Sequence, residues 1–159
     1  MSDNFDLNRL SRDIIDHTPV AVVFADPGGI IRLWNSGAEG MFGYSASEAL
    51  GKSLDLIVPE KHRPKHWEGY DTVMKTGVTK YGHQVLAVPA LTKDGRRISI
   101  EFNVALLRDD SGQVSGVAAT IADVTARWEK EKALRARLAD LEAKVKSLSG
   151  ATEAKTSVH

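Results

Sequence analysis

The chain contains no cysteine, and this absence excludes several kinds of site. Disulfide bridges, thiolate zinc sites and cysteine nucleophiles are impossible, and so is a photoreceptor that bonds its chromophore through a thiol. Any cofactor of this chain must therefore be held by packing, by hydrogen bonds, or by nitrogen and oxygen ligands.

An excess of charge and long apolar runs are also lacking. The 159 residues include 21 basic and 21 acidic side chains, which gives a formal net charge of zero at pH 7. Attraction to nucleic acid or to acidic lipid is therefore not expected. No apolar run approaches the roughly 20 residues of a membrane helix, and the first residues lack the layout of a signal peptide. We expect a cytoplasmic protein with no nucleic-acid or membrane partner.

Residues 19–126 are predicted to form one α+β domain. Five apolar or alternating runs are typical of strands, at residues 20–25, 30–34, 85–91, 97–107 and 114–121. Helical segments separate the second run from the third, and the longest covers residues 59–76. Because short turns connect the strands, we predict a five-stranded antiparallel sheet with short helices on one face.

Helices are predicted on both sides of this domain. Residues 1–18 hold an amphipathic helix, because Leu7, Leu10 and Ile14 recur at helical spacing. Residues 127–149 are rich in Ala, Glu, Lys, Arg and Leu. Residues 150–159 are polar, and we predict that they are disordered.

The C-terminal helix has the apolar repeat of a coiled coil. Its members follow one another in steps of 4, 3, 4 and 3 residues, namely Leu134, Leu138, Leu141, Val145 and Leu148. We therefore predict a parallel homodimer through this helix, with the N-terminal helix adding to the interface.

In their order and spacing, several short motifs resemble those of PAS sensor domains. They are IIRLWN at 30–35, FGYS at 42–45 followed by Glu48 and Gly51, KDG at 93–95 and DVT at 123–125. The resemblance covers about residues 10–125. It implies the PAS fold and a sensory role that acts on a downstream kinase, cyclase or transcription partner. The chain would then be either a part of a larger signalling protein or a stand-alone module.

Within the PAS family, residues 59–66 and Tyr70 are similar to the haem-binding branch, which includes the rhizobial oxygen-sensing kinases and the bacterial direct oxygen sensors. The resemblance implies that His66 is the proximal ligand of a haem iron, bound as neutral imidazole. It also implies that Tyr70 lies on the haem-facing side of the helix, and that Phe102 and Val104 match the distal wall.

Leu86 departs from the pattern of that branch. In those sensors an arginine on the strand after the helix points at bound oxygen, and the matching residue here is Leu86. A charged hydrogen-bond donor for bound oxygen is therefore missing. His83, just before the same strand, is a candidate sixth iron ligand in a resting state.

Other interpretations of these histidines remain open. His66 also fits a solvated helix residue, and His83 also fits a loop. His62, four residues before His66, has a spacing that can share a metal on a helix, but Pro64 between them makes that geometry unfavourable.

Other ligands and functions remain open as well. The alternatives to haem are FAD or FMN held without a covalent bond, a fatty acid, a carboxylate, or no ligand in a module that only dimerises. We expect no enzymatic activity, because the sequence has no Ser-His-Asp pattern, phosphate-binding loop or dinucleotide fingerprint.

Overall fold

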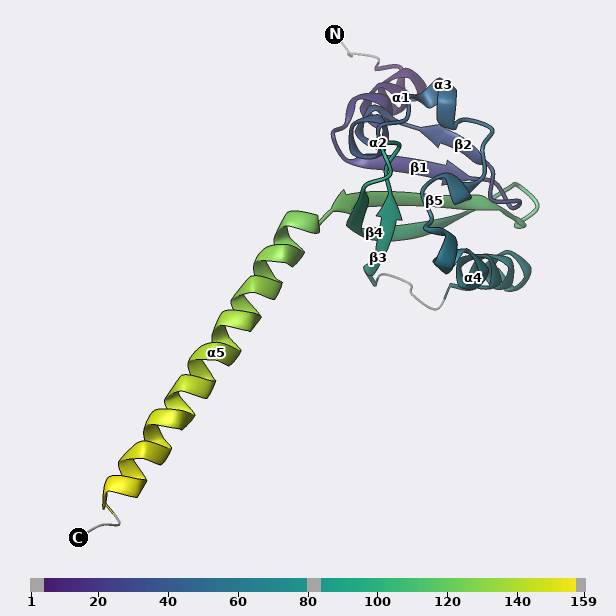
Figure 1. Cartoon of the computed structure of the whole chain (residues 1–159). Helices are drawn as coiled ribbons and strands as arrows, with labels where there is room; N and C mark the ends of the chain where they lie inside the picture. Colours follow the sequence, from purple (N-terminus) through teal and green to yellow (C-terminus); the bar gives the residue numbers. More distant parts are fainter. Residues whose placement is uncertain (1–4, 80–83, 157–159) are drawn as a thin grey trace. The chain divides into compact units, whose positions relative to one another are not determined.

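The computed structural model describes residues 5–79 and 84–156, and the chain divides into two units, Met1–Val124 and Thr125–His159 (Figure 1). The first unit contains a five-stranded sheet and four α-helices. The second unit is a single long helix, α5 (Thr125–Thr156).

The five strands form one antiparallel sheet in the spatial order β2-β1-β5-β4-β3 (Figure 1). They are β1 (Ala21–Ala25), β2 (Ile31–Trp34), β3 (Leu86–Leu91), β4 (Arg97–Arg108) and β5 (Val114–Asp123). The predicted sheet is confirmed, and each strand end lies within two residues of its predicted position.

Helical segments occupy the chain before β1 and between β2 and β3. They are α1 (Leu7–His17), α2 (Ser36–Phe42), α3 (Ala46–Ala49) and α4 (Arg63–Thr76), with 3-10 turns at Leu54–Leu56 and Glu60–His62. The predicted helix over 59–76 therefore starts as a 3-10 turn. Its α-helical part begins just before Pro64, because proline has no amide hydrogen and suits the first turn of a helix.

Local sequence signals set the ends of the shorter helices. The side chain of Asn35 accepts a hydrogen bond at the start of α2, and Gly43 ends this helix with a φ of 82°. Ser45 and Glu48 form the capping box predicted by their spacing. These signals keep α2 and α3 short.

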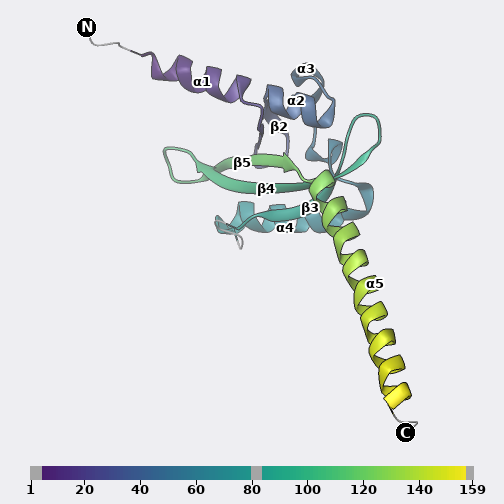
Figure 2. The ribbon, with the colours of Figure 1, turned by 90° about the vertical axis from the view of Figure 1, so that its left-hand side faces the viewer.

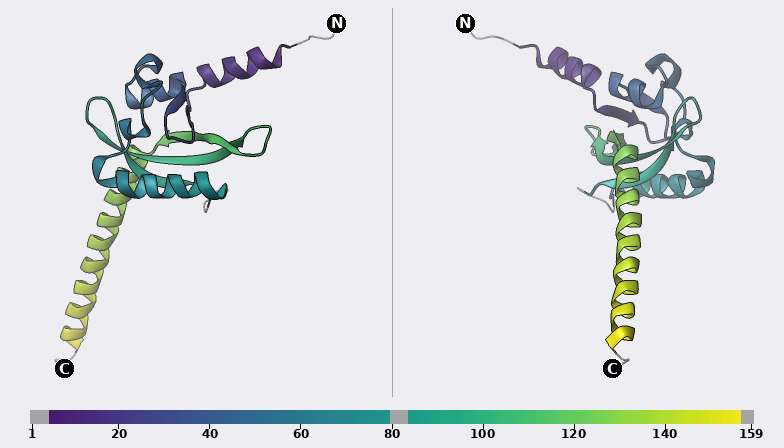
Figure 3. Two further views of the ribbon diagram at one scale, coloured as in Figure 1. Left: turned by 90° about the vertical axis from the view of Figure 1, so that its right-hand side faces the viewer. Right: turned by 60° about the vertical axis from the view of Figure 1, so that its left-hand side comes forward.

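The hydrophobic core lies between the sheet and the α2–α3 segment. Ile98 and Ile100 of β4 and Ile121 of β5 are at most 5% exposed, and Phe42 of α2 is fully buried. In contrast, no residue of α4 is fully buried. In Figures 2 and 3, α2 and α3 gather near β2 whereas α4 lies apart from them. The helices therefore differ in how they are attached to the sheet.

The buried side chain of Asn35 connects α1, β1 and α2. Its Nδ2 donates hydrogen bonds to the carbonyls of Ile15 (2.9 Å) and Val20 (2.8 Å). Its Oδ1 accepts hydrogen bonds from the amides of Val22 (2.8 Å) and Ala38 (2.9 Å). One amide side chain thus satisfies backbone groups in or next to α1, β1 and α2.

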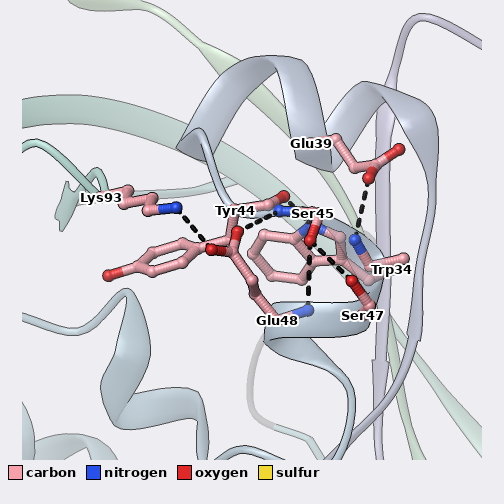
Figure 4. Close-up of polar contacts among 8 residues, drawn as sticks. Trp34, Glu39, Tyr44, Ser45, Ser47, Glu48 and Lys93 are labelled. Atoms are coloured by element: carbon pink, nitrogen blue, oxygen red, sulfur yellow. Dashed lines mark hydrogen bonds and ion pairs between the residues drawn. The ribbon is translucent and has the colours of Figure 1, made fainter.

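A second polar cluster attaches the turn between β3 and β4 to α3 (Figure 4). Lys93 Nζ lies 2.5 Å from Glu48 Oε1, and the other carboxylate oxygen of Glu48 accepts the amide of Ser45 at 2.8 Å. The indole of Trp34 donates to the carbonyl of Tyr44 at 3.0 Å. The hydrogen bond from Lys93 lowers the pKa of Glu48.

The helix α5 leaves the predicted coiled-coil stripe exposed. It also continues to Thr156, which differs from the predicted start of disorder at residue 150. Gly150 costs a helix roughly 1 kcal/mol, but the flanking Ala151, Glu153 and Ala154 favour helix and offset this cost. Among the described residues, no helix is both long and apolar enough to cross a bilayer.

We predict that Asn35→Ala lowers the free energy of unfolding by about 2–4 kcal/mol, because the change removes a helix cap and leaves buried backbone groups unpaired. Urea denaturation of the whole chain measures this loss. Asn103→Ala is the control, since Asn103 is exposed on β4 and its loss should stay within about 0.5 kcal/mol. Similar losses in both variants would contradict the role assigned to Asn35.

Candidate functional site

His66 lies on α4 beside the rings of Trp67 and Tyr70. Its ring centroid is 4.8 Å from that of Trp67 and 5.9 Å from that of Tyr70. The side chain is partly buried, and its Nδ1 is buried without a hydrogen-bond partner. Burial lowers the pKa of His66, although the carboxylate of Asp55 acts in the opposite direction. The imidazole is therefore neutral at pH 7, which is the form that binds metal ions.

The two aromatic neighbours of His66 attach α4 to the turn between β1 and β2. Trp67 Nε1 donates to Asp55 Oδ1 at 2.8 Å, and the Tyr70 hydroxyl donates to the carbonyl of Asp26 at 2.5 Å. A β-carbon at Gly29 would lie 2.2 Å from carbons of the Trp67 ring. The indole thus occupies space that only glycine leaves free at this position.

The hydroxyl of Tyr70 keeps its proton over the physiological pH range. Burial raises its pKa to about 12, and the nearby carboxylate of Asp26 adds to the increase. The hydroxyl can therefore donate to the Asp26 carbonyl throughout this range.

The turn that receives Trp67 and Tyr70 is itself fixed by the side chain of Asp26. One carboxylate oxygen accepts hydrogen bonds from the amides of Gly28 and Ile30, both at 3.0 Å. The other oxygen accepts a hydrogen bond from Arg32 Nε at 2.8 Å. Because three donors hold this carboxylate, α4 is attached to a turn with one defined conformation.

Arginine side chains hold both ends of α4. At its start, Arg63 donates to the carbonyls of Val58 (3.1 Å) and Asp55 (3.2 Å). Beyond its end, Arg108 of β4 donates to the carbonyl of Gly77 at 2.7 Å. The helix that carries His66 is thus held largely by polar bonds and by two aromatic rings, without a fully buried residue.

The three sheet residues of the predicted site lie on one face of the sheet. This is the inner face, which also carries the buried Ile100 of β4. Leu86 of β3 lies directly opposite Phe102 of β4, and Val104 is two residues further along β4. All three are only partly buried. Ile100 on the same face is 4% exposed, whereas its cross-strand neighbour Val88 is 40% exposed. Apolar cover is therefore complete at one end of the inner face and incomplete towards Leu86.

The predicted site residues thus fall into two groups. His66 and Tyr70 are in ring contact on α4, and Leu86, Phe102 and Val104 lie together on β3 and β4. His83, the candidate sixth ligand, lies outside the described residues. His62 has a buried Nε2 without a partner, yet no three histidine, aspartate or glutamate side chains gather into a metal site in residues 5–79 and 84–156.

Sequence reasoning missed the residues that attach α4 to the domain. Asp26, Gly29 and Asp55 had no expected contact with α4. The turn motif DPGG at 26–29 was a correct local signal. Its contact with Trp67 joins residues 38 positions apart, and no local pattern predicts such a contact.

A family model described as PAS fold matches residues 15–129. The chain is 38% identical over 55 residues to the sensor protein FixL of Bradyrhizobium diazoefficiens, covering 35% of this chain and 11% of that protein. It is 27% identical over 124 residues to an uncharacterized protein of Azorhizobium caulinodans, covering 77% and 17%. The chain therefore matches only a small part of the length of either relative.

Solved structures share the fold at low sequence identity. The PAS domain of a protein from Colwellia psychrerythraea has a TM-score of 0.67 at 22% identity, covering 76% of this chain and 99% of that one. An RNA-binding light-oxygen-voltage receptor has a TM-score of 0.69 at 21% identity, covering 88% and 40%. The PAS domain of BvgS from Bordetella pertussis has a TM-score of 0.58 at 22% identity, covering 88% and 99%.

We predict that Gly29→Ala displaces Trp67 and lowers the free energy of unfolding by about 2–4 kcal/mol, because it adds a steric clash to the cost of a positive φ. Chemical denaturation gives the loss, and the ring ¹⁵N chemical shifts of His66 report the movement of α4. Gly95→Ala is the matched control, since Gly95 has a similar φ (79°) and no neighbouring atom within 4 Å. Equal losses in the two variants, with unchanged His66 shifts, would contradict the role of the Trp67 contact.

Proposed function

This chain belongs to the PAS family, and we propose that it is a sensor module that binds haem through His66. The observation that carries the proposal is the state of His66, a partly buried imidazole with a lowered pKa and a ring nitrogen that has no partner. The resemblance of residues 59–66 and Tyr70 to haem-binding sensors supports it. The partial match to a protein named as a sensor is in keeping with it.

The residues around His66 fit a haem. A haem supplies four nitrogen ligands of its own, so the protein needs to add only one axial histidine. A buried ring nitrogen without a partner costs about 1–3 kcal/mol, and coordination removes this cost. Leu86, Phe102 and Val104 offer partly exposed apolar surface to the macrocycle. When bound, haem supplies an iron that takes a diatomic gas or changes its redox state.

The contacts of α4 suggest how a change at His66 is transmitted to the rest of the domain. Trp67 and Tyr70, which flank His66, both touch the turn after β1. A shift of α4 therefore acts on β1, which pairs along its length with β5. The chain continues from β5 directly into α5. We propose that α5 relays this change as a parallel dimer to a kinase, cyclase or transcription partner, and that the chain itself has no enzymatic activity.

Three alternatives remain to the haem assignment. They are a flavin (FAD or FMN) held without a covalent bond, another ligand such as a fatty acid or carboxylate, and a PAS module that only dimerises. The visible spectrum of the purified protein separates them. A Soret band supports haem, a flavin band supports a flavin, and no absorbance leaves the colourless ligands and the dimerisation module.

We predict that the protein reconstituted with hemin shows a sharp Soret band with one haem per chain, and that His66→Ala abolishes or strongly weakens it because the axial ligand is lost. His62→Ala is the control, since His62 also has a buried, unpartnered ring nitrogen near the start of α4. Stoichiometric binding in His66→Ala would refute the assignment. Loss of binding in His83→Ala instead would transfer the ligand role to that residue.

We predict that the ferrous protein holds carbon monoxide stably, whereas oxygen binds weakly or oxidises the iron. Bound oxygen is polar and needs a charged or strong hydrogen-bond donor more than carbon monoxide does, and Leu86 offers none. Leu86→Arg should therefore prolong the lifetime of the oxygen complex, followed by its visible spectrum. An oxygen complex of the unaltered protein that persists for hours in air would contradict this prediction.

We predict that the chain is a dimer at tens of micromolar and that removing residues from Ala133 onward weakens it. The stripe of five apolar residues on α5 is exposed in the single chain, and each buried leucine contributes roughly 1.5–3 kcal/mol. Light scattering on both forms measures the change. A monomeric full chain would contradict the proposed relay. Equal dimerisation of both forms would assign the interface to the first unit and α1.

A further inference from the structure

Arg108, at the end of β4, bonds to two backbone carbonyls. Its Nη2 donates to the carbonyl of Gly77 at 2.7 Å, and its Nη1 donates to the carbonyl of Gly112 at 3.0 Å. Both acceptors are neutral backbone groups. Among the described residues, no aspartate or glutamate forms an ion pair with Arg108. Three of the five guanidinium N–H groups are thus left for another acceptor.

Arg108 lies at the end of the row of apolar residues that β4 contributes to the candidate site. Phe102, Val104 and Leu106 alternate onto the inner face of β4, and Arg108 follows two residues later. Its guanidinium reaches Gly77, the residue that ends α4. The apolar surface of β4 beneath α4, which is incompletely covered, therefore ends at a cation. This cation is the Arg108 guanidinium, and it is bonded to the residue that ends α4.

The present partners of Arg108 are weaker than a carboxylate would be. The bonds from the charged guanidinium to the two carbonyls are already stronger than neutral hydrogen bonds, but a carboxylate adds an opposite charge and can accept two parallel bonds from one guanidinium. The Gly77 carbonyl is favoured only by the partial negative charge at the end of a helix. An anion that reached this point would compete with both carbonyls for Arg108.

We propose that Arg108 receives the anionic group of the ligand beneath α4, and that this exchange releases the end of α4 from β4. This inference rests on the proposed function and names the ligand class as an apolar body with a carboxylate at its edge. Haem and a long-chain fatty acid share this chemistry. The exchange couples ligand binding to the Gly77 end of α4 and, through Gly112, to the hairpin between β4 and β5.

The test compares each acid with its uncharged ester on the whole chain. Hemin is paired with its dimethyl ester, and palmitate with methyl palmitate. The unaltered protein should bind at least one of the acids about tenfold more tightly than its ester, and Arg108→Gln should remove this preference. Arg97→Gln is the control, because Arg97 is an exposed arginine at the opposite end of β4, and it should keep the preference.

Hydrogen exchange of the backbone amides provides the second readout. Arg108→Gln should speed exchange at residues 76 and 77 in the ligand-free protein. The preferred acid should speed exchange at the same amides in the unaltered protein, whereas its ester should not. If Arg108 has only a structural role, Arg108→Gln should weaken the binding of acid and ester equally. The acid should then leave these amides protected in the unaltered protein.

The outcomes separate this inference from the haem assignment. Hemin binding that needs His66 but shows no acid preference overturns the role of Arg108 and leaves the proposed function intact. A preference for palmitate that depends on Arg108, without hemin binding, supports the role of Arg108 and overturns haem as the ligand. If neither acid is preferred over its ester, the inference is wrong.

Discussion

The contact between the Trp67 indole and the bare Cα of Gly29 is the constraint on which the site depends. A β-carbon at position 29 would lie 2.2 Å from the ring, so α4 approaches the β1–β2 turn only because that residue is glycine. The neighbouring bond from Tyr70 to the Asp26 carbonyl holds the same two elements together. His66 lies beside both rings, and its position follows from where this contact places α4.

The chemistry of His66 follows from the same arrangement. The rings that attach α4 also remove water from the imidazole, and this burial lowers its pKa. No residue of α4 is fully buried. Polar bonds at Arg63, Tyr70 and Gly77 hold the helix in place of a buried apolar face. A helix held in this way moves at a lower cost than a helix sealed into the core.

The sequence predicted the elements of the fold well because their signals are local. The alternation in β4, the cap at Asn35, the stop at Gly43 and the capping box at Ser45 each involve residues only a few positions apart. The end of α5 was misplaced because residues 150–159 were judged by their polarity, whereas Ala151, Glu153 and Ala154 favour helix. The attachment of α4 was missed, since the contacts of Trp67 with Gly29 and of Arg108 with Gly77 join residues more than 30 positions apart.

The central claim is that His66 supplies the axial ligand from the position that the Trp67–Gly29 contact gives it. Imidazole rescue of His66→Gly tests it most directly, because the free base fills the space left by the side chain and restores the missing ligand. We expect the variant to be folded by circular dichroism, to bind hemin poorly, and to regain the Soret band of the unaltered protein when imidazole is added. A folded His66→Gly protein that shows this band without imidazole, or that imidazole does not rescue, would contradict the account.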